Sequence, residues 1–181
     1  MALTLDATPG GIASNTYATV AEANLYHEAN FYSASWFLFI PAQQVQLLVM
    51  ATRLLDEQVE WDGSKSYRTQ ALRWPRRGVT ERDGNGSMYD PYFGSYTIDS
   101  TIIPVWLKNA TAELARVLGQ EDRTAESSIQ EFTSMSIGSL SLTKDPGGTK
   151  DVIPASVRAM VDPYGCVASS NGLRFIKLER S

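Results

Sequence analysis

The side chains able to carry acid–base or nucleophilic chemistry are few in this chain. His27 is its single histidine and Cys166 its single cysteine. Neither is flanked by a nucleophile or metal-binding signature, which argues against a catalytic Cys–His pair. We expect His27 to lie on a half-exposed helix face and Cys166 to fill a small apolar space. One cysteine allows no intrachain disulfide.

Two glycine-containing segments superficially suggest ligand sites. Pro146–Lys150 lacks the spacing of a phosphate-binding loop, so we interpret it as a turn. Asp83–Ser87 begins like a calcium loop, but Met88 and Gly94 stand where that loop needs Gly and Glu. An acidic cluster ends the second expected helix, and we interpret it as a solvated face: Asp56, Glu57, Glu60 and Asp62. The sequence therefore predicts no catalytic residue, no cofactor and no metal, and hence no enzyme.

One segment has the composition of a binding surface. From Gly63 to Val79 there is no acidic residue, and Tyr67 and Trp74 are interleaved with basic residues. These basic residues are Lys65, Arg68, Arg73, Arg76 and Arg77. Further aromatic residues follow at Tyr89, Tyr92, Phe93 and Tyr96.

Three interpretations of this segment stay open. Arginine with aromatic residues is typical of protein interfaces, because both make large contacts that tolerate partial desolvation. The same composition is typical of grooves that stack single-stranded nucleic acid. Alternatively, Trp74 and Pro75 pin the loop onto its own core while the arginines cap helix ends. Under the interface interpretation, Trp74 stabilises the isolated chain whereas Arg76 contributes only on assembly.

The most apolar window of the chain, Trp36–Ile40, is the second interface candidate. It is far too short to span a bilayer, and large apolar surface on a soluble chain often marks an interface. The interface candidates from both segments are Trp36, Phe37, Phe39, Arg68, Arg73, Trp74, Arg76, Arg77, Tyr92, Phe93 and Tyr96.

Composition narrows the class of function. The 181 residues fit a single domain, 43% are hydrophobic, and the start shows no signal peptide. The net charge of -4 and the pI of about 5.0 argue against general nucleic-acid binding, which usually needs a basic excess. We expect an extended arm at 1–16, a long irregular interaction loop at 62–100 and a C-terminal tail at 166–181.

The elements that position these segments are expected to be mainly α. Thr19 and Glu22 form a capping-box pattern for a helix from Val20 to about Tyr32, with Leu25, Ala29 and Tyr32 on one face. Proline at 41 and 104 suits the first turns of two further helices, and Gly119 suits a C-terminal cap. Apolar spacing places the core of this three-helix bundle at Leu48, Leu55, Leu107 and Leu114.

The last third of the sequence predicts a β-hairpin and a short helix. Met135 and Ile137 alternate with serines, and the apolar phase shifts at Gly138, which favours a bulge or tight bend. A turn at 145–148 follows. Ile153-Pro154 opens a short C-terminal helix that ends near Pro163, and 173–178 is apolar enough for a final strand.

Blocks spread over 17–165 resemble a family of head-to-tail connector adaptors of tailed bacteriophages. The blocks are Tyr17–Ala23, Ala51–Asp56, Trp61–Gly63, Gln70–Val79, Ile103-Pro104, Ala110 with Ala112–Ala115, Ser136–Leu140 and Ile153-Pro154. Their order is more specific than any one of them. The stretch 84–100 departs from the pattern, and we expect it to contact a neighbour.

The resemblance implies a structural adaptor of the phage neck. Such a protein forms a ring, commonly of twelve subunits, that joins the portal to the tail or to the next connector (stopper) protein. Double-stranded DNA passes through without sequence-specific binding. The implied location is the virion neck, with the host cytoplasm during assembly and no membrane. The same group is also labelled a DnaT-like single-stranded-DNA-binding protein, so a single-stranded-DNA-binding module is the alternative.

Overall fold

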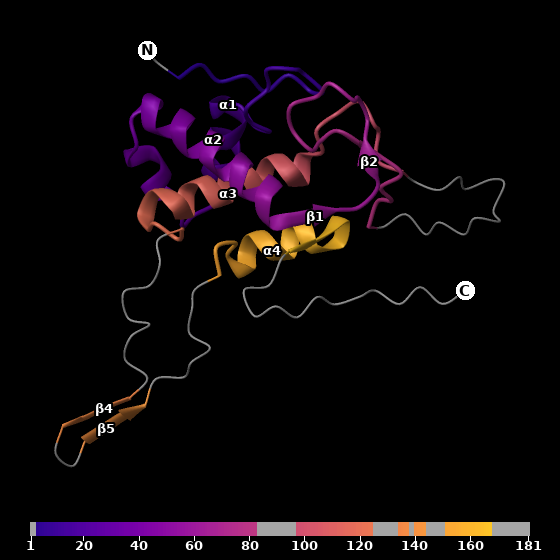
Figure 1. Cartoon of the computed structure of the whole chain (residues 1–181). Helices are drawn as coiled ribbons and strands as arrows, with labels where there is room; N and C mark the ends of the chain where they lie inside the picture. The colour runs from indigo at the N-terminus through magenta and orange to yellow at the C-terminus, as the bar shows by residue number, and fades with distance from the viewer. Residues whose placement is uncertain (1–2, 83–96, 125–133, 138–139, 144–150, 168–181) are drawn as a thin grey trace, which may run out of the picture.

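The computed structural model describes residues 3–82, 97–124, 134–137, 140–143 and 151–167. Figure 1 shows the helices gathered into one body. In chain order the elements are α1 (Val20–Glu28), the 3-10 helix η1 (Ala34–Leu38), α2 (Pro41–Gln58), β1 (Val59–Trp61), β2 (Ser64–Lys65), β3 (Arg76–Arg77), α3 (Val105–Gln120), β4 (Ser134–Ile137), β5 (Leu140–Thr143), α4 (Ala155–Val161), the 3-10 helix η2 (Asp162–Tyr164) and β6 (Gly165–Val167). The described chain is helix-rich with small antiparallel strand pairs.

The core lies between α2 and α3, as the apolar spacing predicted. Leu48 and Leu55 of α2 and Leu107 and Leu114 of α3 are fully buried. α4 packs against α3, and α1 contacts both long helices. Burying a Leu side chain is worth about 1.5–3 kcal/mol, so this seam is a main source of stability.

The first helix is shorter than expected and buries a different face. The Thr19 capping box is present, but α1 ends at Glu28. Ala23 and His27 are its buried residues, while Leu25 and Tyr32 are exposed. His27 was therefore misplaced on a half-exposed face. Its burial is possible because both ring nitrogens find partners in the folded chain.

Gly119 does not cap α3, which continues to Gln120. A Cβ at position 119 would lie 2.5 Å from Phe39 Cζ and 2.9 Å from Leu47 Cδ1. The glycine thus allows Phe39, which follows η1, and α2 to approach the last turn of α3. The helix was expected to begin near Thr101 with Pro104 in its first turn; it begins at Val105, and Pro104 is its N-cap.

Three antiparallel strand pairs complete the described fold. β1 pairs with β6, which ties the end of α2 to the segment after α4, and β2 pairs with β3. Cys166 in β6 is exposed, so it does not fill an apolar space. β4 and β5 form the expected hairpin within 134–143. The expected turn at 145–148 and the strand at 173–178 lie outside the described residues.

Candidate interaction surfaces

The N-terminal segment is bonded to itself and to the loop at 63–79 rather than extended as an arm. Asn15 N donates to Asp6 O at 2.9 Å, and Ala71 N donates to Gly11 O at 3.0 Å. The 1–16 segment, described from residue 3, thus folds back on itself and on the loop at 63–79, which we call the basic loop. This fixes the position of Tyr17, which follows it directly and is buried.

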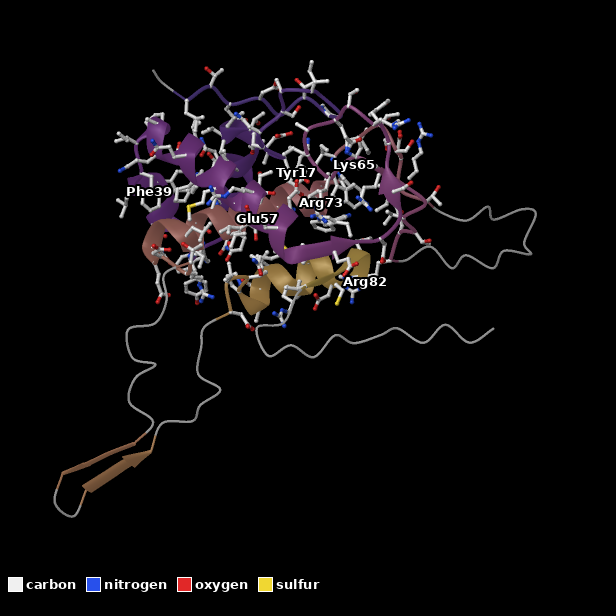
Figure 2. The ribbon with its side chains drawn as sticks, viewed as in Figure 1. Tyr17, Phe39, Glu57, Lys65, Arg73 and Arg82 are labelled. Atoms are coloured by element: carbon white, nitrogen blue, oxygen red, sulfur yellow. The ribbon has the colours of Figure 1, made fainter. Side chains whose placement is uncertain are left out.

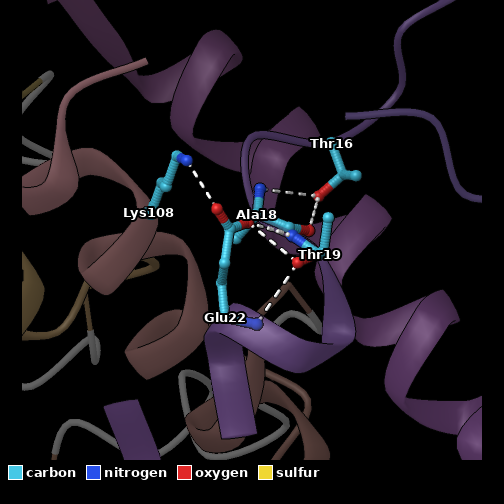
Figure 3. Close-up of polar contacts among 5 residues, drawn as sticks. All are labelled: Thr16, Ala18, Thr19, Glu22 and Lys108. Atoms are coloured by element: carbon cyan, nitrogen blue, oxygen red, sulfur yellow. Dashed lines mark hydrogen bonds and ion pairs between the residues drawn. The ribbon is translucent and has the colours of Figure 1, made fainter. Parts of the chain in front are cut away.

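Glu22 joins the start of α1 to α3. Its carboxylate accepts from Thr19 N at 2.8 Å and from Lys108 Nζ at 2.5 Å (Figure 3). Burial of Glu22 opposes ionisation, but the bonds from Lys108 and Thr19 outweigh it and lower the pKa of this carboxyl. The capping box predicted from sequence is therefore also a contact between two helices.

A buried tyrosine holds the basic loop against α2. The Tyr17 hydroxyl donates to Asp56 Oδ1 and accepts from Trp74 N at 3.2 Å. Asp56 Oδ2 accepts from Arg73 N at 3.0 Å. Burial, followed by the charge of Asp56, raises the pKa of Tyr17 well above its ordinary value, so the phenol stays protonated. Asp56 is thus a structural acceptor and not part of a solvated acidic face.

The Trp74 ring is enclosed by other aromatic rings. It lies edge-on to Trp61 at 5.8 Å and to Trp106 at 5.3 Å between ring centroids. Trp106 in turn stacks on Tyr164 at 4.1 Å. These partners come from β1, α3 and η2, so the loop is packed onto the three parts of the chain that meet there.

Arg76 acts as an internal strut. Its Nε donates to Asp62 O at 2.5 Å and its Nη1 to Arg73 O at 3.2 Å. Its Nη2 donates to Trp61 O at 3.1 Å and to Gly63 O at 2.7 Å. One guanidinium therefore donates to four backbone carbonyls. The planar fork of arginine suits this role, whereas a lysine ammonium does not.

A shallow groove of about 480 Å³ lies beside Asp56, the residue that accepts from Tyr17, and it is bounded by the N-terminal segment, α2 and the basic loop. Figure 2 shows Tyr17, Lys65 and Arg73 close together on this side of the molecule. The charged residues that line the groove are Arg53, Asp56, Glu57, Lys65 and Arg73. Arg53 Nε is paired with Glu57 at 3.6 Å, and Lys65 Nζ donates to Gln70 O at 3.3 Å. The groove thus carries both acidic and basic side chains, and Arg53 and Lys65 already have partners within the chain.

The comparisons with known proteins give one match. A family model described as "Putative DnaT-like ssDNA binding protein" matches residues 1–181. The chain belongs to this family. Comparison with curated proteins and with solved structures gave no match.

The structure separates the candidate interface residues of this family member into two groups. Trp36, Trp74 and Arg76 are buried within the subunit, which favours the pinning interpretation for the last two. Arg76, expected at a subunit contact, is instead turned inward, where it donates to four backbone carbonyls within 61–73. The exposed candidates are Phe37, Arg68, Arg73 and Arg77, and Phe39 is half-buried. Tyr92, Phe93 and Tyr96 lie outside the described residues.

An exposed apolar surface lies on the turn and the 3-10 helix that connect α1 to α2. We call it the 31–40 surface. Its residues, with their exposed fractions, are Phe31 (90%), Tyr32 (83%), Phe37 (48%), Leu38 (82%) and Ile40 (60%). Sequence reasoning identified the 36–40 window but missed Phe31 and Tyr32, which it placed on or beside the first helix. Their lack of a buried partner becomes visible only once α1 ends at Glu28.

The described part of the chain shows neither a metal site nor a membrane-spanning helix. In 3–82, 97–124 and 151–167, no group of three or more His, Cys, Asp or Glu residues is placed to hold a metal ion. No described helix combines the length and apolar character needed to cross a membrane.

Proposed function

We propose that this protein is a structural adaptor of the bacteriophage neck, a subunit of a ring that joins the portal to the next connector or tail protein. The observation that carries the proposal is the exposed 31–40 surface. The resemblance of the sequence blocks to connector adaptors supplies the specific assembly, and the ring is expected to contain about twelve subunits.

The chemistry of the 31–40 surface favours a protein partner. Contiguous exposed apolar residues are costly in water and mark interaction sites more often than chance placement. No residue between Glu28 and Arg53 carries a charge. A surface for nucleic acid would instead carry lysines and arginines for the phosphates. Phe31 and Tyr32 also have the side-chain types that dominate the energetics of protein interfaces.

Overall charge is compatible with the passage of DNA through such a ring. The net charge of -4 provides no general attraction for phosphates. Strong phosphate contacts would retain the DNA, so a wall of neutral or acidic character suits a conduit.

Light scattering on the protein mixed with its portal tests the proposal. We expect a complex of ring size that neither component forms alone. Phe31→Asn combined with Leu38→Asn should abolish the complex, since both side chains are exposed and their loss does not disturb the core. Ile12→Asn, which replaces an exposed apolar residue of the N-terminal segment, is the control and should retain it. A protein that stays strictly monomeric and ignores the portal refutes the adaptor.

Single-stranded-DNA binding is the second candidate, and the exposed loop favours it. Tyr67 is partly exposed, Arg68, Arg73 and Arg77 are exposed nearby, and the family description names ssDNA binding. Against it, Asp56 and Glu57 line the same groove as Lys65 and Arg73 and would repel phosphate.

A titration with a short single-stranded oligonucleotide at several salt concentrations separates the two candidates. The adaptor proposal predicts no specific binding near physiological salt. Tight binding that falls steeply with salt, and that disappears in the Arg68→Ala, Arg77→Ala double variant, would establish the second candidate instead. Both arginines are exposed, so this variant tests binding without removing the Arg76 strut.

A further inference from the structure

His27 joins separate parts of the chain at the end of α1. Its Nδ1 lies 3.0 Å from Ser33 Oγ, and its Nε2 lies 3.1 Å from Ala112 O in α3. Its ring also packs on the ring of Trp36 at 4.9 Å between centroids. The buried imidazole thus connects α3 to the residues that carry the 31–40 surface, which together with their link to α1 we call the 29–40 segment.

The partners of the ring favour the neutral imidazole. Ala112 O can only accept a hydrogen bond, so Nε2 carries the hydrogen and Nδ1 accepts from the Ser33 hydroxyl. A second proton, on Nδ1, would leave the hydroxyl hydrogen of Ser33 without an acceptor, because Ser33 Oγ has no other partner among the described residues. The imidazolium would also lose its hydration in this buried site.

The charged groups that face the ring do not offset this cost. On α3, Glu113 favours the imidazolium and Arg116 opposes it, and the two are paired with each other at 2.6 Å. On α1, Tyr26 lies edge-on to the imidazole at 5.1 Å, and burial raises the pKa of its phenol, which stays neutral. The 29–40 segment and α2 carry no charge before Arg53. Burial is the largest influence and lowers the pKa of the imidazole.

The other side-chain bonds of the 29–40 segment do not titrate near neutral pH. Trp36 Nε1 donates to Asn24 Oδ1 at 2.7 Å, and Gln44 Nε2 donates to Trp36 O at 3.3 Å. Gln120 Nε2 donates to Ser35 Oγ at 2.6 Å. Indole, amide and hydroxyl groups keep their charge between about pH 5 and pH 8, whereas an imidazole does not. The imidazole is therefore the group through which pH acts on this segment.

We propose that His27 is a pH-sensitive latch, whose protonation releases the 29–40 segment from α3 while the α2–α3 core stays folded. The release is local because only Ser33 and Trp36 are buried in this segment. Segments with few buried contacts open at a lower free energy than the core does. The inference rests on the proposed function for its biological role, since it assigns acid control to the 31–40 surface.

Native-state hydrogen exchange read by NMR tests the latch. The amides of Ser33 and Trp36 donate to carbonyls within or beside the segment, whereas those of Leu55 and Leu114 lie inside α2 and α3. Opening at Ser33 and Trp36 should depend little on low urea concentrations, because it exposes little surface. It should also become more frequent below about pH 6.5, by up to about tenfold per pH unit. Leu55 and Leu114 should exchange through a larger, urea-sensitive opening.

Variants and a direct titration identify the responsible group. Since the chain has one histidine, the imidazole signal of the untagged protein reports His27 without further assignment. We expect its titration midpoint below about 6.5. His27→Gln keeps an N–H donor and an oxygen acceptor and should remove the pH dependence of the opening. Glu28→Gln changes the exposed neighbour of His27, so it is the matched control and should retain that dependence.

Three results would overturn the latch. They are an imidazole midpoint at or above about 6.5, an opening at Ser33 and Trp36 that does not change with pH, and a urea dependence at these amides equal to that of Leu55. All three are read on the wild-type chain, so they decide the question even if His27→Gln does not fold. None needs the portal. A latch that opens in a chain that ignores the portal removes the adaptor alone, whereas a chain that joins the portal but shows no local opening removes the latch alone.

Discussion

Replacing Arg76 by Ala should destabilise the isolated chain strongly. The change removes donors from four backbone carbonyls, of which Trp61 O is buried and the others are partly buried. An unsatisfied buried acceptor costs about 1–3 kcal/mol, and the partly buried ones about 0.5 kcal/mol each where water can replace the lost donor. The sum is about 3.5 kcal/mol. At roughly 2–4 °C per kcal/mol for a chain of this size, the melting temperature should fall by about 7–14 °C.

The neighbouring arginine provides the control. Arg77 is exposed, so Arg77→Ala should change the free energy of unfolding by less than about 0.5 kcal/mol. Arg76→Lys should fall between the two, because one ammonium cannot reproduce the fork of a guanidinium. Melting followed by circular dichroism measures all three. If Arg76→Ala melts within a degree or two of Arg77→Ala, the guanidinium is not a strut and the case for internal pinning fails.

Three further predictions concern other buried groups. Tyr17→Phe should cost about 1–3 kcal/mol in urea unfolding, because Trp74 N–H and Asp56 Oδ1 both lose the Tyr17 hydroxyl as their partner. Tyr67→Phe on the exposed loop should be neutral, and equal effects of the two changes would contradict the role of Tyr17. Burial lowers the pKa of His27, so the unfolded chain binds a proton at this residue more tightly than the folded chain does. The free energy of unfolding should therefore be highest above the ordinary histidine pKa near 6.5 and should fall as the pH drops below it, which a pH series of melting curves measures. His27→Gln should make the stability less dependent on pH in this range. Gly63→Ala should destabilise the chain by about 2 kcal/mol more than Gly78→Ala, as measured by unfolding. Both glycines have positive φ, so backbone strain is common to the two changes. A Cβ at position 63 would lie 2.2 Å from Arg77 O, whereas a Cβ at position 78 meets nothing within 4 Å.

Regular helical periodicity explains what could be predicted from the sequence. Leu48, Leu55, Leu107 and Leu114 repeat at helical spacing, and each is fully buried. The Thr19 capping box and Pro104 as an N-terminal residue were also correct, because both signals act within four residues of the helix start. These features could be predicted because helical spacing and helix-start signals depend on residues close together in the sequence.

Partners distant in sequence explain what could not be predicted. His27 is buried because Ser33 Oγ lies 3.0 Å from Nδ1 and Ala112 O lies 3.1 Å from Nε2, and nothing near position 27 indicates the second contact. The β1–β6 pair likewise joins residues about a hundred positions apart.

The loop around Trp74 and the 31–40 surface could likewise be predicted only in part from the sequence. The sequence correctly marked the loop around Trp74 as unusual and left interface and pinning open. It could not decide between them, because the carbonyls that Arg76 serves arise from an irregular backbone path that has no periodic signature. The 31–40 surface was recognised only in part, since Trp36 turns inward to donate from Nε1 to Asn24 Oδ1 at 2.7 Å while Phe37 and Leu38 stay outside.

Negative-stain imaging of the purified protein together with its portal is the sharpest test of the neck-adaptor assignment. We predict a closed ring of this protein, of about twelve copies, stacked on one end of the portal. The Phe31→Asn, Leu38→Asn variant should give bare portals under the same conditions. Portals that stay bare with the wild-type protein at saturating concentration would contradict the assignment of this chain as a neck adaptor.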